Sequence, residues 1–305
     1  MNQKCTQDEL NPVAKHWFLR LYAGILRVPL DEALNCGPDT HQNGDGNIAR
    51  ELKKAANRLK SEGFDPETEK VDYATLASSD ALADYVEITR ALKTFDPGTL
   101  HSPDARKAFW INLYNALIIH TVIAYSIEKS MLELRGVFDR AAYVVGGYRY
   151  STNDIEHGIL RANRGPAYLP FKQFRSDDPR LGYALEAVDY RLHFTLNCGA
   201  QSCPPIGFYQ ENLLNQQLDL AARHFVNHGG VEIKRDENEI AVSQLLRWYA
   251  VDFGGNPLYR INVNIDRVLK TIAPYIDDEA DRTFIIEYVD TANIRFVPYD
   301  WTLNA

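Results

Sequence analysis

The chain has 305 residues, of which 45% are hydrophobic and 24% are charged, so it can bury a sizeable core as one large or two intimate domains. This composition is typical of a soluble globular protein and excludes a fibrous or disordered chain. The 33 basic and 41 acidic residues give a net charge of −8, which argues against nonspecific nucleic-acid binding because such binding needs a basic surface.

The N-terminal sequence MNQKCTQDEL lacks the basic and then apolar order of a signal peptide, and Arg20 and Arg27 interrupt the most apolar early run. We therefore expect a cytoplasmic protein that does not insert into a membrane. The four cysteines, at positions 5, 36, 198 and 203, are too few and too scattered for a disulfide framework. We expect free thiols.

Helical spacing of apolar residues predicts helices over residues 10–35 and over residues 47–63, the second ending at a glycine. Residues 37–51 between them resemble a calcium loop, but the first ligand would be His41 and the twelfth Leu52, where a carboxylate is required. We interpret this segment as a turn linker.

Residues 72–100 predict one or two further helices that stop at Pro97-Gly98. The next helix, within residues 104–130, is apolar nearly all the way round, which indicates burial on most faces. Its polar exceptions Asn112, Asn115 and His120 fall within one arc of about 140°. This face could therefore receive another polar segment.

The pattern changes after residue 140 and predicts strands mixed with helices. We expect a hairpin at 141–151, a helical turn at 152–165 capped by Asn153 or Asp154, a strand at 189–198, a helix at 209–230, a hairpin at 231–243, a helix at 244–255, and late strands at 283–290 and 293–304. The predicted fold class is α+β, with a central buried helix packed on a small antiparallel sheet.

Five blocks carry a family resemblance: FWINLYNALIIH, IEHGILR, HFTLNCGAQSCPP, LLRWYAVDFGG and YDWTLN. In this order and spacing they resemble the DUF547 family, whose members have no established activity. The resemblance covers roughly residues 75–304 and leaves residues 1–74 as a helical N-terminal extension. In plants such domains form the C-terminal parts of larger proteins, which implies a possible interaction role.

Two of these blocks contain the groups that thiol chemistry requires: Cys198 and Cys203 as thiols, and His157 and His193 as imidazoles. If residues 189–198 form a strand, His193 and Cys198 point to opposite faces. His157, from a different element, is then the better partner for Cys198, and Gly199 could let that cysteine turn outward. Cys203 lies near the start of the next helix, where backbone N–H groups could favour a thiolate.

The main hypothesis is a cysteine-dependent acyl-transfer or hydrolytic enzyme, or its inactive descendant, with Cys198 as nucleophile and His157 as base. Glu156, His193, Cys203 and Asn112 complete the candidate catalytic set, and the substrate or partner would be an unknown peptide or protein. The stretch CGAQSC has only a superficial likeness to papain-like enzymes, so a rearranged papain- or transglutaminase-like core is no more than a fold analogy.

Two alternatives remain open. In the first, the protein is a non-enzymatic interaction domain: Cys198 is a packed thiol, Glu156 and His157 anchor a buried turn with Arg161, and the asparagines satisfy backbone groups. In the second, Cys198, Cys203, His193 and His157 bind zinc. The wide cysteine spacing argues against zinc, so we expect no metal and no cofactor. On every hypothesis the blocks at 109–120, 155–161 and 193–204 should converge in space, since buried polar groups need partners.

Overall fold

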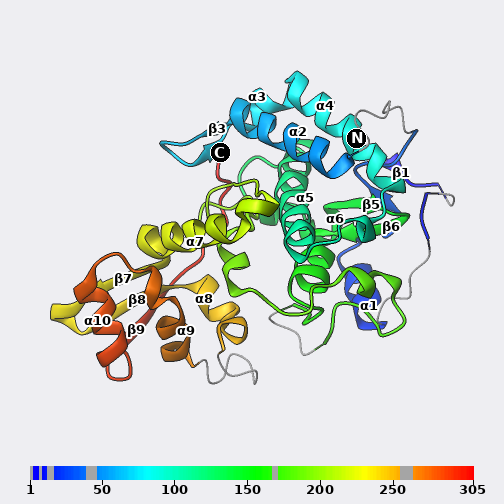
Figure 1. Ribbon diagram of the computed structural model, residues 1–305. Helices are drawn as coiled ribbons and strands as arrows, with labels where there is room; N and C mark the ends of the chain where they lie inside the picture. Colours follow the sequence, from blue (N-terminus) through cyan, green and yellow to red (C-terminus); the bar gives the residue numbers. More distant parts are fainter. Residues whose placement is uncertain (1–2, 7–8, 12–16, 39–46, 167–170, 255–263) are drawn as a thin grey trace.

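The computed structural model describes residues 3–6, 9–11, 17–38, 47–166, 171–254 and 264–305, and the molecule is a mixed α+β protein (Figure 1). The helices are α1 Trp17–Ile25, α2 Ile48–Gly63, α3 Tyr73–Ala77, α4 Asp80–Ala91, α5 Pro103–Ala124, α6 Val137–Arg140, α7 Leu214–Phe225, α8 Gln244–Trp248, α9 Ile265–Ile272 and α10 Glu279–Tyr288. The strands are β1 Gln3–Lys4, β2 Glu32–Ala33, β3 Phe64–Asp65, β4 Lys70–Val71, β5 Ala142–Val145, β6 Tyr148–Ser151, β7 Val231–Lys234, β8 Glu239–Ser243 and β9 Asn293–Val297.

Helix α5 is the centre of the larger hydrophobic core. It begins with the Ser102 side chain accepting a hydrogen bond from the backbone N–H of Ala105, and residues 108–122 are buried on all sides. Helices α2, α3 and α4 cover one end of it, and the β5–β6 hairpin packs along its side, where the Trp110 and Tyr150 rings lie 4.9 Å apart (Figure 1). The predicted buried helix on a small antiparallel sheet is confirmed.

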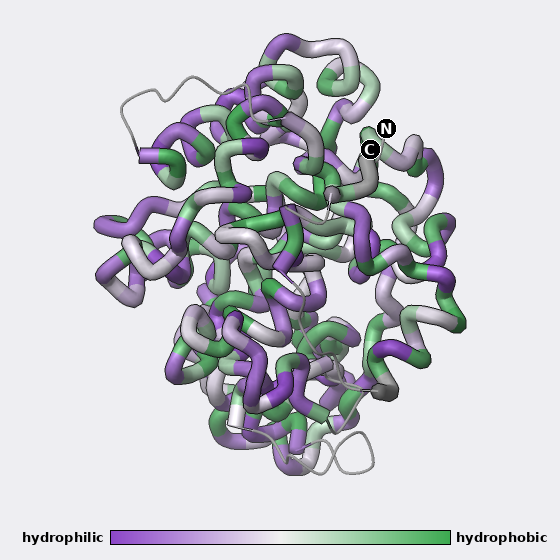
Figure 2. The backbone as a smooth tube through the Cα atoms, turned by 90° about the vertical axis from the view of Figure 1, so that its right-hand side faces the viewer, coloured by the Kyte–Doolittle hydropathy of each residue, from purple (hydrophilic) through white to green (hydrophobic). Residues whose placement is uncertain are grey.

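A second core fills the C-terminal part of the molecule. Strand β8 pairs antiparallel with β7 and parallel with β9, and helices α7, α8, α9 and α10 all contribute apolar side chains to this core. The segment around residue 194 joins the two cores, since Leu192 and Leu196 belong to the first and Phe194 to the second. Figure 2 shows hydrophilic and hydrophobic stretches alternating along the outer segments, as expected for elements with one face on a core.

Several predicted elements are confirmed. The β5–β6 hairpin turns at Gly146 and Gly147, whose φ angles of 57° and 79° lie in the left-handed region that a tight hairpin turn requires. The hairpin β7–β8, the helix α7 and the strand β9 also lie where the pattern predicts them. The predicted boundary between residues 74 and 75 falls inside α3 and stays a prediction.

Two predicted strands are wrong. Residues 190–194 form a 3-10 helix, because the Asp189 side chain accepts a hydrogen bond from the backbone N–H of Arg191 and both sides of the segment are buried. The alternation of apolar and polar residues there reflects two different buried surroundings rather than one buried and one exposed face. Residues 283–288 belong to α10, which Asp278 caps by accepting a hydrogen bond from the backbone N–H of Asp281.

The N-terminal part also differs from expectation. The helix predicted over residues 10–35 is described only as α1, and Glu32–Ala33 pairs with β1 as a strand. The predicted turn linker at residues 37–51 lies partly outside the described residues, which omit 39–46. Among the residues that are described, no helix is both long enough and apolar enough to span a membrane.

The expectation of four free thiols is wrong, because Cys5 and Cys36 form a disulfide. The β1–β2 pairing places their Cα atoms 5.0 Å apart although 31 positions separate them in sequence. Disulfides persist mainly in oxidising compartments, so the predicted cytoplasmic localisation has no support from cysteine chemistry. Cys198 and Cys203 are free thiols.

Candidate functional site

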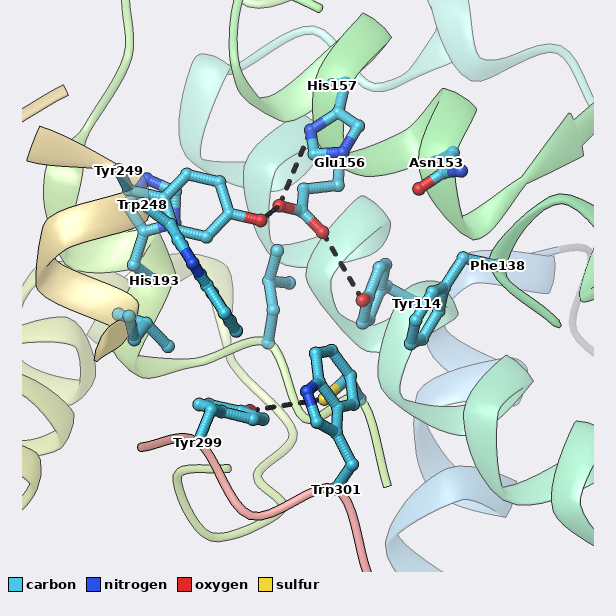
Figure 3. Close-up of a pocket in the computed structure, with 13 residues that line it drawn as sticks. Tyr114, Phe138, Asn153, Glu156, His157, His193, Trp248, Tyr249, Tyr299 and Trp301 are labelled. Atoms are coloured by element: carbon cyan, nitrogen blue, oxygen red, sulfur yellow. Dashed lines mark hydrogen bonds and ion pairs between the residues drawn. The ribbon is translucent and has the colours of Figure 1, made fainter. Parts of the chain in front are cut away.

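A cavity of about 270 Å³ lies where the α5 core meets the C-terminal part of the chain. Six of its lining residues are aromatic, and the polar ones include a thiol, two imidazoles and a carboxylate (Figure 3). The aromatic residues are Tyr114, Phe138, Trp248, Tyr249, Tyr299 and Trp301, and the polar ones are Asn153, Glu156, His157, His193 and Cys198. The predicted convergence of the blocks at 109–120, 155–161 and 193–204 is confirmed.

One end of the cavity carries the two free thiols. The Sγ atoms of Cys198 and Cys203 are 2.7 Å apart, and the Tyr299 hydroxyl lies 3.3 Å from the first and 3.1 Å from the second. The backbone N–H of Cys198 also donates to the sulfur of Cys203, at 3.0 Å. Only Cys198 is among the residues that line the cavity.

These contacts shift the pKa values of the two thiols in opposite directions. The hydrogen bond to Cys203, together with burial, raises the pKa of Cys198 well above its ordinary value. Burial alone would raise the pKa of Cys203, but hydrogen bonds from the Cys198 thiol and the Tyr299 hydroxyl lower it below its ordinary value. When the pair loses one proton, the negative charge therefore resides mainly on Cys203.

Backbone geometry around Gly199 positions the two thiols and the C-terminal segment beside them. Gly199, directly after Cys198, has a φ of 83°, and a Cβ atom there would lie 2.8 Å from the sulfur of Met131. The C-terminal segment runs alongside, since the backbone N–H of Gln201 donates to the carbonyl of Thr302 and that of Asn304 to the carbonyl of Gly199. This pairing places Tyr299 beside the two thiols.

The other end of the cavity is formed by the π-helix at residues 154–160, which carries Glu156 and His157. The Tyr249 hydroxyl donates to Glu156 Oε1 at 2.5 Å, and the Tyr114 hydroxyl approaches Oε2 at 3.4 Å. Burial alone would raise the pKa of Glu156, but the neighbouring His157, Tyr249 and Arg161 lower it below its ordinary value. Glu156 is therefore ionised at neutral pH.

His157 is a neutral imidazole at neutral pH. Burial lowers its pKa to about 4, although Glu156 Oε1 lies 3.5 Å from its Nδ1. The Arg161 guanidinium, which can only donate, lies 3.1 Å from the same nitrogen. Nδ1 is thus the acceptor, and Nε2 carries the proton in the resting state.

His193 belongs to a buried network that Arg161 links to His157. Its Nε2 lies 2.8 Å from Asp252 Oδ2, and its ring stacks on Tyr249 with the centroids 3.9 Å apart. The same carboxylate binds Arg161 at 2.6 Å and Arg164 at 2.9 Å. Asp252 is therefore the centre of an ion-pair network behind the wall of the cavity.

The asparagine side chains of α5 form hydrogen bonds with backbone groups of other segments. Asn112 donates to the carbonyl of Tyr209 and accepts from its N–H, so both ends of its amide are used. Asn115 donates to the carbonyls of Thr195 and Gly207. Their predicted alternative role of satisfying irregular segments is confirmed, and Asn112 does not line the cavity.

The two ends of the cavity face each other across open space. In Figure 3, Tyr299 and Trp301 lie opposite Glu156 and His157. Among the described residues, no hydrogen bond joins Cys198 or Cys203 to a histidine. In the same described part of the chain, no group of three or more His, Cys, Asp or Glu side chains could hold a metal ion, so the predicted zinc ligands are not assembled as a set.

Sequence reasoning missed Asp252 and the aromatic wall of Trp248, Tyr249, Tyr299 and Trp301. All five residues lie in the blocks LLRWYAVDFGG and YDWTLN, so the family resemblance already contained the signal. Their role depends on a meeting of distant segments that no local pattern encodes. The cap of the π-helix was also misassigned, since Ser151 and Asp154 bond each other reciprocally.

Comparison with known proteins confirms the family resemblance over a shorter range than expected. Residues 99–226 match the model of DUF547, described as a protein of unknown function. The matched segment contains Glu156, His157, His193 and both free cysteines, whereas Trp248 and Tyr299 lie beyond it. No curated protein and no solved structure gives a match. The papain- or transglutaminase-like core therefore stays a prediction.

Proposed function

We propose that the chain is a thiol-dependent acyl-transfer or hydrolytic enzyme whose substrate occupies the cavity, with Cys198 as the nucleophile. The observation that carries the proposal is a single cavity with a thiol at one end and an imidazole beside an ionised carboxylate at the other. An interaction domain with a filled interior would have no such space. Convergent polar groups in a mainly aromatic pocket are typical of substrate sites.

The partner of Cys198 in this proposal is Cys203 rather than His157. The two sulfurs are 2.7 Å apart, whereas His157 lies across the cavity from Tyr299, to which both thiols are bonded (Figure 3). When the pair has lost one proton, the charge resides mainly on Cys203, whose pKa is lowered, and in that state Cys203 can accept the proton of Cys198. This replaces the sequence-based assignment of His157 as the base.

The proposed reaction uses only the two thiols, the acyl substrate and water or an amine. Cys198 Sγ bonds to the acyl carbon as its proton moves to Cys203, and the bond from that carbon to the leaving nitrogen or oxygen breaks. The leaving group takes the proton from Cys203. Water or an amine next attacks the thioester and gives its proton to Cys203, and Cys198 recovers that proton as the carbon–sulfur bond breaks. His157 and Glu156 hold the far end of the substrate.

The test is to trap the acyl-enzyme. Folded protein is incubated with p-nitrophenyl acetate, quenched in acid and mapped by mass spectrometry. We expect one acetyl group on Cys198, released by neutral hydroxylamine as a thioester must be. Cys203→Ala should slow the acylation about 100-fold, as expected for the loss of a general base.

Two controls make the result decisive. Cys198→Ala should abolish the hydroxylamine-labile adduct. Asn57→Ala, on the exposed face of α2, should leave the rate of acylation unchanged. An adduct confined to lysines, or a Cys198 that stays unmodified until the protein unfolds, would refute the proposal. The interaction-domain hypothesis would then replace it.

A further inference from the structure

Glu156 is a buried carboxylate that lacks a cationic partner in direct contact. Among the described residues, no lysine or arginine forms an ion pair with it, and its ion-pair neighbour His157 is neutral at pH 7. Oε1 receives a short bond from Tyr249, but Oε2 has only the Tyr114 hydroxyl, at 3.4 Å. A buried carboxylate is costly unless charge or strong donors compensate it, and Oε2 retains the capacity to accept.

The wall of the cavity opposite this carboxylate is aromatic and suits an alkyl chain. Trp248 and Tyr299 have ring centroids 5.1 Å apart, and Tyr299 and Trp301 lie 4.8 Å apart, so three rings form one continuous aromatic surface. Such a surface buries the methylene groups of an alkyl chain that extends across the cavity from Glu156. Among the described residues, no lysine or arginine lines the cavity.

The nearest guanidinium is already engaged. Arg161 bonds Asp252 and His157, and Arg164 bonds the other oxygen of Asp252. Neither side chain lines the cavity, and both pair with Asp252 behind its wall. Glu156 is therefore the ionised side chain in the described cavity lining, which favours a cationic ligand.

We infer that the cavity binds a primary alkylammonium group, with the ammonium on Glu156 Oε2 and the alkyl chain against Trp248, Tyr299 and Trp301. A cavity of about 270 Å³ has room for such a chain between the two polar ends. Because Oε2 can accept further hydrogen bonds, it favours an ammonium that donates N–H bonds over a quaternary ammonium. A primary alkylammonium compound is thus the inferred substrate class of the site. The inference rests on the proposed function only in treating this ligand as a substrate.

Binding is measured on Cys198→Ala protein, so that thiol chemistry does not contribute. Isothermal titrations at pH 7 and constant ionic strength use n-butylammonium chloride, 1-butanol and tetramethylammonium chloride. We expect n-butylammonium to bind at least about tenfold more tightly than 1-butanol, because only the ammonium forms a charge-assisted hydrogen bond with Glu156 in a desolvated site. Tetramethylammonium should bind more weakly than n-butylammonium, since it has no N–H donor.

Glu156→Gln keeps the shape of the side chain and removes its charge, so it should reduce n-butylammonium affinity to that of 1-butanol. The matched control is Glu232→Gln, an exposed carboxylate on β7, which should change neither affinity. If circular dichroism shows that Glu156→Gln is unfolded, Trp248→Leu replaces it and should weaken the binding of both n-butylammonium and 1-butanol several-fold, through loss of apolar contact with the alkyl chain.

The inference is overturned by equal affinities for n-butylammonium and 1-butanol, or by a folded Glu156→Gln variant that binds n-butylammonium as the parent does. Its failure can be told from that of the enzyme proposal. Ammonium binding without acylation of Cys198 refutes only the enzyme, and acylation without ammonium binding refutes only this ligand class.

Discussion

At the residue scale, Asn115 joins the central helix to the segment that carries the two free cysteines. Its Nδ2 donates to the carbonyls of Thr195 and Gly207, and its Oδ1 accepts from the backbone N–H of Asn197, all at 2.9 Å. The residue is fully buried. Three backbone groups in an irregular segment depend on it, because a segment outside a sheet or α-helix cannot satisfy them itself.

Asn115→Ala should therefore destabilise the protein by about 3–5 kcal/mol, since three buried backbone groups lose their partner. The measurement is urea unfolding at pH 7, with the slope compared between variants. Asn57→Ala, in the exposed part of α2, should stay within about 0.5 kcal/mol of the parent. A loss below about 1 kcal/mol for Asn115→Ala would contradict the assignment and indicate that water replaces the amide.

At the element scale, the π-helix at 154–160 presents Glu156 and His157 to the cavity. Reciprocal bonds between Ser151 and Asp154 start it, and close packing against Phe174 holds it in place. A wider helical turn of this kind is common at functional sites, because it changes the direction of a side chain by adding one residue to a turn.

Gly158→Ala tests this packing. The added Cβ would lie 2.3 Å from two ring atoms of Phe174, so the helix or the ring must shift. We expect a loss of about 1–3 kcal/mol in urea unfolding, as for other overpacked positions. Gly182→Ala is the control, because no heavy atom lies within 4 Å of its added Cβ. Equal stabilities of the two variants would show that Phe174 does not constrain the helix.

At the scale of the whole molecule, the disulfide between Cys5 and Cys36 links the segment after β1 to the segment after β2. The bridge closes a loop with a sequence separation of 31. Cross-linking a loop of this length restricts the unfolded chain and stabilises the folded one by about 3–4 kcal/mol in the chain-entropy account.

The Cys5→Ala/Cys36→Ala double variant should lose about this 3–4 kcal/mol in urea unfolding. Thiol titration of the parent in denaturant without reductant should find only Cys198 and Cys203 reactive. Four reactive thiols under those conditions would contradict the bridge and restore the expectation of a fully reduced protein.

The sequence by itself determined the elements whose pattern is local. The mainly apolar pattern of α5, the paired glycines of the β5–β6 turn and the amphipathic α7 are each specified by periodicity and turn chemistry within a short window. It also identified the polar face of α5 and the blocks that converge on the cavity, because buried polar groups require partners wherever they lie in the chain.

Only the tertiary structure decided which distant groups meet. Residues 190–194 alternate like a strand but form a 3-10 helix, since both faces are buried by different cores and periodicity cannot reveal two-sided burial. The pairing of Cys5 with Cys36, the contact of His193 with Asp252 and the placing of Tyr299 beside Cys198 join segments 31, 59 and 101 residues apart. Such contacts depend on the path of the whole chain, which no local window contains.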